Sequence, residues 1–350
     1  MLSNEQSNSK ILIIRLSSMG DVLLTSKLIR NLRKNFKNSI IKFITNKEYE
    51  DLIKYNPYLD EYLLYEKYNI DKINELQNNL NEFKPDLIID LQNNKRSKEL
   101  TKNFTNNIFK FDKRTFYKLL LVYTKINKTT KYELIPDLYC KTLKLPNFEI
   151  DNLGLEIWLN NNENYENILN RKYYKKNKYK IAVAPGATFK TKRIPNDILI
   201  KILKNLSKKL EIEYFLIGGK DEIDISNRIE QEIDCINYTG RLSILETARI
   251  VDQTDLLITN DTGIMHIASA RRIPIIVFYG GTIPNFGFVP YHTPHIIFEN
   301  DLWCRPCSHI GRNFCPLLHF NCMKKFNDEE ISDKIIAFLN NLYKFGQINL

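Results

Sequence analysis

Near its amino terminus the chain reads ILIIRLSSMGD over residues 11–21. The first six residues form a largely apolar, β-branched run, which is typical of a strand buried in a parallel sheet. Two serines and Gly20 then allow a tight turn, and an apolar helical pattern follows over residues 21–34. A strand that leads through a short turn into a helix is the unit of an open α/β sheet, in which ligands bind beyond the carboxyl ends of the strands.

The same alternation continues along the chain and restarts after the basic segment RKYYKKNKYK at residues 171–180. A chain of 350 residues is too long for one ordinary domain and suits two. We therefore expect an α/β protein with two Rossmann-like parallel-sheet domains, residues 1–170 and 171–328. A last helical stretch falls within residues 329–350, and we expect it to pack back on the first domain. The expected strands are 11–16, 40–45, 62–65, 87–91, 108–111, 181–184, 214–218, 256–260 and 275–279.

Composition and charge narrow the classes of function. The chain has no run of 18 apolar residues, and its polar start does not resemble a signal peptide, so we expect a cytoplasmic protein. The net charge of +10 is concentrated in residues 1–150, where 26 Lys and Arg face 18 Asp and Glu. This excess indicates an anionic partner, such as a phosphorylated glycolipid or a membrane surface, or else a plain compositional bias. Nucleic acid is not expected, because no helix-turn-helix, RNA-recognition or zinc-finger signature accompanies the charge.

Two of the turns that follow strands suggest catalysis and phosphate binding. Asp21 is either an N-cap or first-turn acid that stabilises its helix, or a carboxylate that takes a proton from a substrate hydroxyl. The loop PGATFKTKR at residues 185–193 contains two hydroxyls and three cations. Lys192 would supply positive charge to a phosphate, and Arg193 would donate two parallel hydrogen bonds to it. The alternative is a basic loop that is only solvated. The loop is not a Walker A sequence.

Two further turns fit a nucleotide. In GGKDE at residues 218–222 the glycines permit close backbone approach, and a carboxylate can accept bonds from ribose hydroxyls, although an ordinary turn is the alternative. In TNDTGIMH at residues 259–266 a helix begins with Gly263, and its first N–H groups and its dipole favour an anion. His266 lies one turn further and would add a donor. The alternative there is an ordinary N-cap with a core histidine.

Four of the six cysteines, Cys304, Cys307, Cys315 and Cys322, fall within nineteen residues, with two histidines between them. Four thiols could hold a structural zinc ion in tetrahedral geometry, but the spacing is not that of paired Cys-x2-Cys motifs. The alternative is a group of buried free thiols. A disulfide framework is not expected in a cytosolic chain.

These loops, in this order, resemble the lipopolysaccharide heptosyltransferase family, glycosyltransferase family 9. The likeness covers nearly the whole chain. It is carried by residues 15–22, 185–188, 260–266 and 279–282 and by the stretch around residues 304–322 that holds the four cysteines, here called the cysteine segment. The resemblance implies a GT-B architecture, in which two Rossmann-like domains face each other across a cleft. It also implies ADP-heptose as the donor, held by the second domain. The implied acceptor is an anionic glycolipid, the inner core of lipopolysaccharide, held by the first.

The family's functional residues carry over to matching positions of this chain. The resemblance makes Asp21 the general base of an inverting, single-displacement transfer of a heptose or a similar sugar, with no metal or other cofactor required. Ser17, Ser18 and Gly20 would form the loop on the acceptor side. The implied donor contacts are Thr188 and Lys192 at the diphosphate, Glu222 at the nucleoside, Asp261 at sugar hydroxyls, and Thr262, Gly263 and His266 at the leaving group.

Alternatives remain open at this level. Ile194 stands where family members often have Trp, so the sugar or its pose could differ. The chain could use another nucleotide sugar or acceptor, or it could be a catalytically silent assembly subunit. A nucleotide-sugar epimerase would carry Gly-x-Gly-x-x-Gly after the first strand, which this chain lacks. Residues 116–125 are apolar, aromatic and flanked by cations, so they either make a peripheral contact with the inner leaflet or pack as an ordinary helix.

Overall fold

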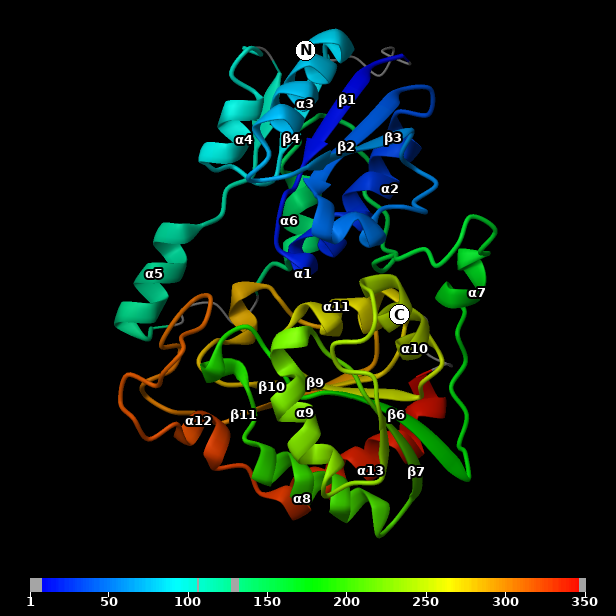
Figure 1. Ribbon diagram of the computed structural model, residues 1–350, viewed down its shortest axis with the longest axis vertical. Coiled ribbons are helices and arrows are strands. Elements are labelled where there is room, and N and C mark those ends of the chain that lie inside the picture. Colours follow the sequence, from blue (N-terminus) through cyan, green and yellow to red (C-terminus); the bar gives the residue numbers. More distant parts are fainter. Residues whose placement is uncertain (1–7, 106, 127–131, 346–350) are drawn as a thin grey trace. The chain divides into compact units, whose positions relative to one another are not determined.

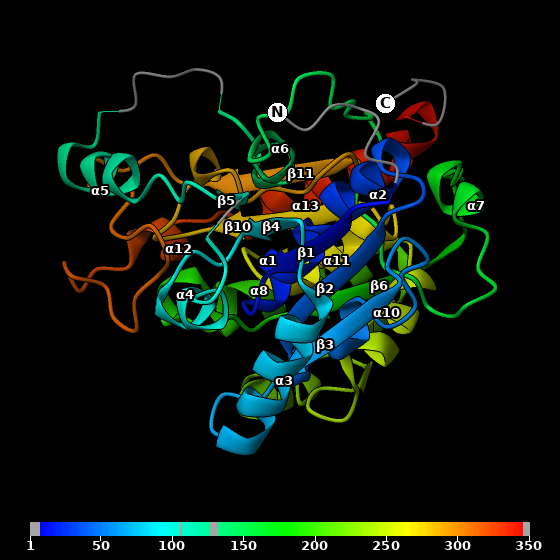
Figure 2. The same cartoon turned by 90° about the horizontal axis from the view of Figure 1, so that it is seen from above.

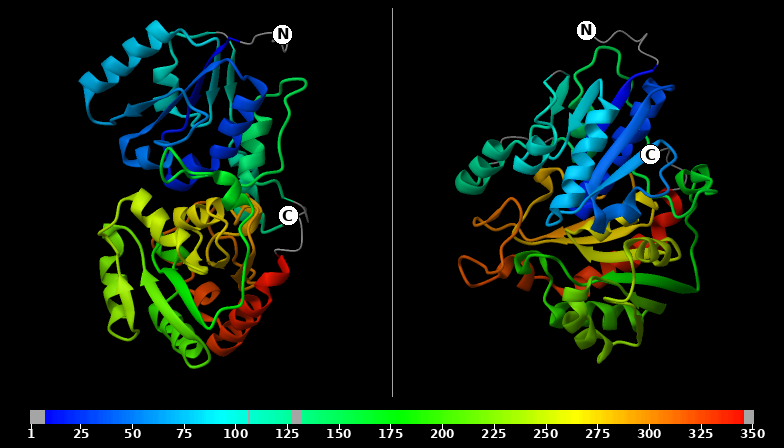
Figure 3. Two further views of the ribbon diagram at one scale, coloured as in Figure 1. Left: turned by 90° about the vertical axis from the view of Figure 1, so that its right-hand side faces the viewer. Right: turned by 45° about the horizontal axis from the view of Figure 1, so that its top comes forward.

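The computed structural model describes residues 8–105, 107–126 and 132–345. Contacts between residues divide the chain into two compact units, Met1–Arg114 with Glu133–Glu163 and Thr115–Tyr132 with Asn164–Leu350. Each unit holds one parallel sheet with helices on both faces (Figures 1 and 3). The expected α/β class with two Rossmann-like sheets is thereby confirmed.

The first unit is built on five parallel strands in the order β3-β2-β1-β4-β5. Apolar residues of β1 are fully buried, and α3 packs its own apolar side chains, Leu76 and Leu80, into the same core. Because β1 is central, the turn that follows it lies in the middle of the carboxyl edge. The strands are β1 (Lys10–Ile14), β2 (Ile40–Asn46), β3 (Glu61–Tyr65), β4 (Leu87–Asp90) and β5 (Ile108–Lys110). The helices are α1 (Met19–Leu24), α2 (Ser26–Asn35), α3 (Ile70–Phe83), α4 (Lys95–Leu100) and α6 (Ile135–Lys141).

The second unit is built on six parallel strands in the order β11-β10-β9-β6-β7-β8. Ser243 caps α10 as its position suggested, since its hydroxyl accepts the Glu246 N–H at 3.2 Å. The strands are β6 (Lys178–Ala184), β7 (Glu211–Leu216), β8 (Cys235–Asn237), β9 (Leu256–Asn260), β10 (Ile275–Tyr279) and β11 (His295–Glu299). The helices are α5 (Thr115–Thr124), α7 (Tyr165–Leu169), α8 (Asn196–Ser207), α9 (Ile223–Glu230), α10 (Ile244–Asp252), α11 (Gly263–Ala270), α12 (Asn321–Lys324) and α13 (Asp328–Phe345). Among the described residues, no helix is long and apolar enough to cross a membrane.

The boundary between the units differs from the expected break at residue 170. A buried ion cluster ties the segment before residue 163 to the first unit, because Arg30 of α2 lies 2.8 Å from both Asp151 and Glu156. The segment after it belongs to the second unit, where the Tyr165 hydroxyl donates to the Ala270 carbonyl. The boundary between the two units therefore lies between residues 163 and 164.

Two helices, α5 and α13, belong to the second unit and not to the first. α5 joins the second unit, where Leu121 and Val122 pack with Phe286. α13 buries its apolar face in the core of that same unit, and the Ser332 hydroxyl donates to the Ile202 carbonyl of α8 at 3.3 Å. The last helix, expected to pack on the first domain, thus belongs to the core of the second unit, where the apolar face of α8 is its partner.

Candidate functional site

Asp21 lies in the first turn of α1, just beyond the central strand β1. Its Oδ1 lies 2.7 Å from the Arg15 guanidinium and accepts a bond from the Tyr139 hydroxyl at 3.2 Å. Its Oδ2 accepts the Ser18 backbone N–H at 3.1 Å and the Ser18 hydroxyl at 2.8 Å. The side chain keeps 17% of its surface exposed. Asp21 thus stabilises the start of α1 and also presents a carboxylate at the edge of the sheet. The two interpretations of this residue are compatible.

The surroundings of Asp21 fix its protonation state. Burial alone would raise the pKa of the carboxyl, but the Arg15 charge and the bonds from Ser18 outweigh it and hold the pKa below its usual value. Burial raises the pKa of Tyr139 well above its usual value. The hydroxyl therefore stays protonated and donates a hydrogen bond to Asp21. The edge of the first sheet therefore presents an ionised carboxylate at neutral pH.

Two cations at this edge were not singled out from the sequence. The Arg96 guanidinium donates to the Ser17 hydroxyl at 3.5 Å, and Arg96 follows β4, the neighbour of β1. Lys113 follows β5, and burial together with the nearby Arg15 charge lowers its pKa. The only sequence signal for them was the excess of eleven basic over two acidic residues in 95–131. Strand order, which local patterns do not reveal, brings them beside the turn that carries Asp21.

In the second unit the loops after the adjacent strands β10, β9, β6 and β7 meet at the carboxyl edge. Lys192 Nζ lies 2.7 Å from Asp261 Oδ2, and the Thr282 hydroxyl donates to the same oxygen at 2.8 Å. The structure thus brings Lys192 and Asp261 together and adds Thr282, which the sequence showed only as part of a motif. Because both contacts fall on Oδ2, Oδ1 is the oxygen of Asp261 that could meet a sugar hydroxyl.

Asn260, a fully buried residue at the end of β9, ties these loops to each other. Its Nδ2 donates to the carbonyls of Pro185 at 2.8 Å and Gly186 at 3.1 Å, and its Oδ1 accepts the Ile194 N–H at 3.0 Å. The Ile194 side chain packs in the core of this unit. A buried polar residue at a strand end was the signal that could have identified Asn260 as a positioning group.

The start of α11 is open to an anion. Thr262 is its N-cap residue, but the Thr262 hydroxyl faces the Thr259 hydroxyl at 3.4 Å and, within the described chain, does not cap the first turn. The N–H groups that begin at Gly263 therefore lack a side-chain acceptor from the cap and suit a phosphate. His266 lies one turn further along α11, is buried, and has its ring centroid 6.4 Å from that of Phe288.

Glu222 lies against the backbone of the loop after β6. Its Oε2 accepts the Gly219 N–H at 2.9 Å, and a Cβ on Gly186 would fall 2.0 Å from its Cδ. Burial raises the pKa of Glu222, although the Gly219 N–H and the Arg193 charge act against it. Thr188 is exposed in the same loop, and Arg193 is held there by a 2.6 Å bond to the Ala187 carbonyl.

The cysteine segment supports the loop after β6. The Thr191 N–H donates to the Arg312 carbonyl at 3.0 Å, and the Arg312 N–H donates back to the Thr191 hydroxyl at 2.8 Å. The Cys307 N–H donates to the Gly281 carbonyl at 3.0 Å, and the Gly281 N–H donates to the Thr191 carbonyl at 2.9 Å. A Cβ on Gly280 would lie only 2.3 Å from the Thr191 carbonyl oxygen, so this close approach requires glycine. The segment thus holds the backbone next to Lys192 in place.

A structural zinc ion at Cys304, Cys307, Cys315 and Cys322, one of the two interpretations of these residues, is not supported. All four are free thiols, and Cys304 Sγ lies 3.9 Å from His319 Nε2. In the part of the chain that the structure describes, no three His, Cys, Asp or Glu side chains are grouped so as to hold a metal ion. Burial raises the pKa of Cys307 and that of Cys322, the latter to about 11, which keeps both as thiols.

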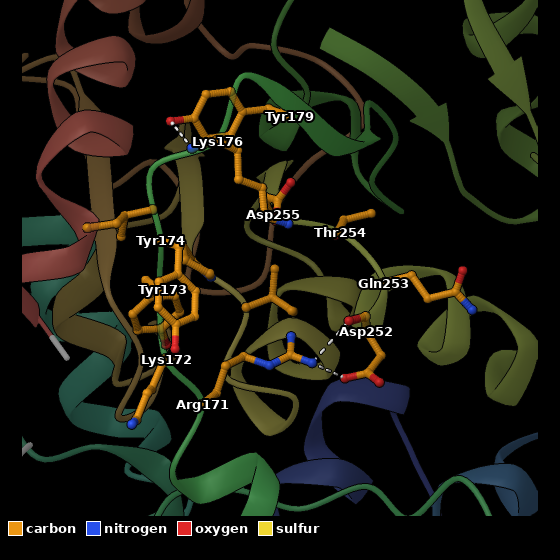
Figure 4. A pocket seen from close by; sticks show the side chains of 13 residues that line it. Arg171, Lys172, Tyr173, Tyr174, Lys176, Tyr179, Asp252, Gln253, Thr254 and Asp255 are labelled. Carbon is orange, nitrogen blue, oxygen red and sulfur yellow. Dashed lines mark hydrogen bonds and ion pairs between the residues drawn. The ribbon is translucent and has the colours of Figure 1, made fainter. Parts of the chain in front are cut away.

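A separate cavity of about 210 Å³ opens at the other edge of this sheet, where β6, β9 and β10 begin (Figure 4). Its charged groups are largely paired, with Arg171 2.7 Å from Asp252 and Lys176 2.6 Å from Asp255. Ligands of open α/β sheets bind at the opposite, carboxyl edge. The cavity is therefore not the candidate site.

Two Rossmann-like parallel sheets, each with polar and charged loops at its carboxyl edge, define the GT-B class of fold. The described chain superposes on the structure of the Escherichia coli ADP-heptose LPS heptosyltransferase II with a TM-score of 0.69 and 19% identity, over 95% of this chain and 99% of that one. At this identity the likeness establishes the fold.

Sequence comparison identifies the family. The model of glycosyltransferase family 9 (heptosyltransferase) matches residues 73–317, and the chain belongs to this family. It is 31% identical to lipooligosaccharide heptosyltransferase 2 of Campylobacter jejuni over 163 residues, which are 44% of this chain and half of that relative. It is 26% identical to lipopolysaccharide heptosyltransferase 1 of Campylobacter coli over 78% of this chain and 84% of the relative. The resemblance found in the sequence is confirmed.

Proposed function

We propose that the chain is an inverting, metal-independent glycosyltransferase that transfers a heptose from ADP-heptose to an inner-core lipopolysaccharide acceptor. The observation that carries this proposal is the group formed by Lys192, Asp261 and Thr282 beside the open start of α11. A cation and backbone N–H groups at one point suit a diphosphate. The relatives' names supply the sugar and the acceptor, because they denote ADP-heptose and lipopolysaccharide heptosyltransferases.

The chemistry divides between the two sheets. Asp21 takes the proton of the acceptor hydroxyl. At the same time the acceptor oxygen attacks the anomeric carbon of the donor sugar from the face opposite the diphosphate. The leaving diphosphate gains negative charge as the bond breaks, and Lys192 with the N–H groups of Gly263 and its neighbours stabilises that charge. This positive charge is the protein's own, so the proposed reaction requires no metal ion. His266 and Thr188 are assigned to the same diphosphate.

Arg96 and Lys113 give the acceptor side its chemical character. Both are cations close to the turn that carries Asp21. Burial and the Arg15 charge lower the pKa of Lys113 and outweigh the opposite effect of the nearby acids. Such a group attracts phosphates or carboxylates. We assign these residues to the anionic groups of a phosphorylated core oligosaccharide. Since that acceptor is a glycolipid, the enzyme is proposed to work in the cytoplasm at the inner face of the membrane.

The decisive experiment is a donor screen with the purified protein and a delipidated core acceptor, following release of the nucleoside diphosphate. We expect release from ADP-heptose that depends on the acceptor, and little from UDP- or GDP-sugars. Acceptor-dependent release from another nucleotide sugar would overturn the assignment of the donor. Absence of release from every donor would favour a catalytically silent member.

Glu222→Ala should raise the KM for the donor by about tenfold while kcat changes little. A nucleoside contact contributes equally in the ground state and the transition state, so its loss appears in KM. Glu232→Ala is the matched control, because Glu232 forms only an exposed pair with Lys204 in the same unit. If both variants showed the same KM, Glu222 would not be a nucleoside contact.

A further inference from the structure

Two segments of the second unit expose an unusual amount of apolar surface. The first is α5 with the residues that follow it, where Phe116, Tyr117, Leu120, Tyr123 and Ile126 are each at least 40% exposed. The second belongs to the cysteine segment, where the same holds for Trp303, Ile310, Phe314, Leu317 and Leu318. These ten make up most of the seventeen large apolar side chains that are exposed in the described chain. We call them together the apolar face.

The two segments lie side by side, as Figures 1 and 2 both show. Lys125 Nζ donates to the Pro306 carbonyl and thereby joins the end of α5 to the cysteine segment. The inner side of α5 is anchored, because Leu121 and Val122 are buried against Phe286. Phe116, Leu120 and Tyr123 recur at helical spacing on the opposite side, which remains exposed. A helix that is packed on its inner side and exposes apolar side chains on its outer side is typical of an interaction surface.

The segments that carry the apolar face contain cations and no acid, although one of these cations, Arg305, pairs at 2.9 Å with Glu299 just outside them. Residues 115–126 contain Lys118 and Lys125 and no acid, and residues 302–320 contain Arg305 and Arg312 and no acid. The chain as a whole carries 41 Asp and Glu, so their absence from both segments is selective. Aromatic and aliphatic side chains interleaved with cations match the interface of a bilayer that bears anionic headgroups. Contact with a second copy of the same surface would instead bring like charges together.

We propose that the apolar face docks the second unit on an anionic lipid bilayer. This inference rests on the proposed function, because an enzyme that acts on a glycolipid must meet its acceptor at a membrane. The sequence indicated a peripheral contact only for residues 116–125. The structure adds the cysteine segment, which Lys125 joins to the end of α5 and in which Trp303 and Leu318 are 78% and 83% exposed. The segment would then have two duties, since it also holds the backbone next to Lys192.

The test is flotation of the full chain with vesicles of phosphatidylcholine mixed with phosphatidylglycerol, and with vesicles of phosphatidylcholine alone. We expect the wild type to bind the mixed vesicles more tightly, and added salt to weaken that binding. The double variant Phe116→Ser/Tyr123→Ser should bind at least about tenfold more weakly, because two aromatic side chains no longer enter the interface. Tyr68→Ser/Ile70→Ser is the matched control, since these residues are 86% and 74% exposed in the first unit.

Turnover of a delipidated acceptor separates this inference from the proposed function. Phe116→Ser/Tyr123→Ser should retain that turnover while it loses vesicle binding. If the chain transferred no sugar at all, flotation would still decide the membrane contact. The inference is overturned if the double variant floats as well as its control. It is also overturned if the wild type ignores vesicles and forms a dimer, by light scattering, that the double variant abolishes.

Discussion

Replacing Asp21 with Asn is expected to lower kcat by about 10²–10⁴-fold while the affinity for the donor is unchanged. The substitution keeps the size of the side chain but removes the charge that accepts bonds from Arg15, Tyr139 and Ser18. An amide cannot take the acceptor proton. The donor contacts are assigned to the second unit, so donor binding should not sense the change. Steady-state kinetics and calorimetric titration with ADP measure the two quantities separately.

The pH dependence gives a second view of Asp21. Its pKa in the folded chain is lowered, so the carboxylate is ionised throughout the neutral range and loses its charge only below the usual value of about 4. Activity should therefore not fall on account of this residue until the pH drops below about 4. Asp137→Asn is the matched control, because Asp137 forms a partly exposed ion pair with Lys27 in the same unit. If Asp21→Asn and Asp137→Asn had the same kcat, the assignment of the base would be wrong.

Replacing Lys192 with Met is expected to lower kcat/KM by about 10²–10³-fold. The ammonium group lies 2.7 Å from Asp261 at the edge where the diphosphate is proposed to bind, so its loss removes charge that meets the leaving group. Most of the loss should appear in kcat, because the diphosphate is most negative in the transition state. Lys192→Arg keeps the charge and should recover part of the activity.

A control is needed because Lys192→Met also leaves Asp261, a buried carboxylate, without its cation. Thermal unfolding of each variant shows how much of the loss is due to folding. Lys204→Met supplies the comparison, since Lys204 pairs with Glu232 on the exposed surface of the same unit. An active, folded Lys192→Met enzyme with the kinetics of Lys204→Met would contradict the proposed role.

The sequence was most informative where function and local pattern coincide. Strand, turn and helix follow one another around Asp21 and again around Gly263, so a short window predicts both the sheet edge and the polar group on it. The boundary near residue 163 and the packing of α13 could not be predicted in this way. They depend on contacts between distant residues, such as Arg30 with Asp151 and Ser332 with the carbonyl of Ile202.

The same reason explains the site residues that were missed. Asn260 and Thr282 position the donor loops through bonds to residues far along the chain, and Arg96 reaches the turn of Asp21 only because β4 lies beside β1. The strands β8 and β11 were missed because they are short or lie at an edge of the sheet, where an apolar run is weak. The clustering of the four cysteines left a structural metal open, whereas their side chains are not arranged to hold one.

Single displacement without a metal ion is tested most directly by the anomeric configuration of the product. The sugar should be transferred from ADP-heptose to the delipidated acceptor in the presence of excess chelator, and the new linkage analysed by NMR. We predict that transfer proceeds at an undiminished rate and that the product has the anomeric configuration opposite to that of the donor. A product that retains the donor configuration, or transfer that stops when chelator is added, would contradict the proposed mechanism.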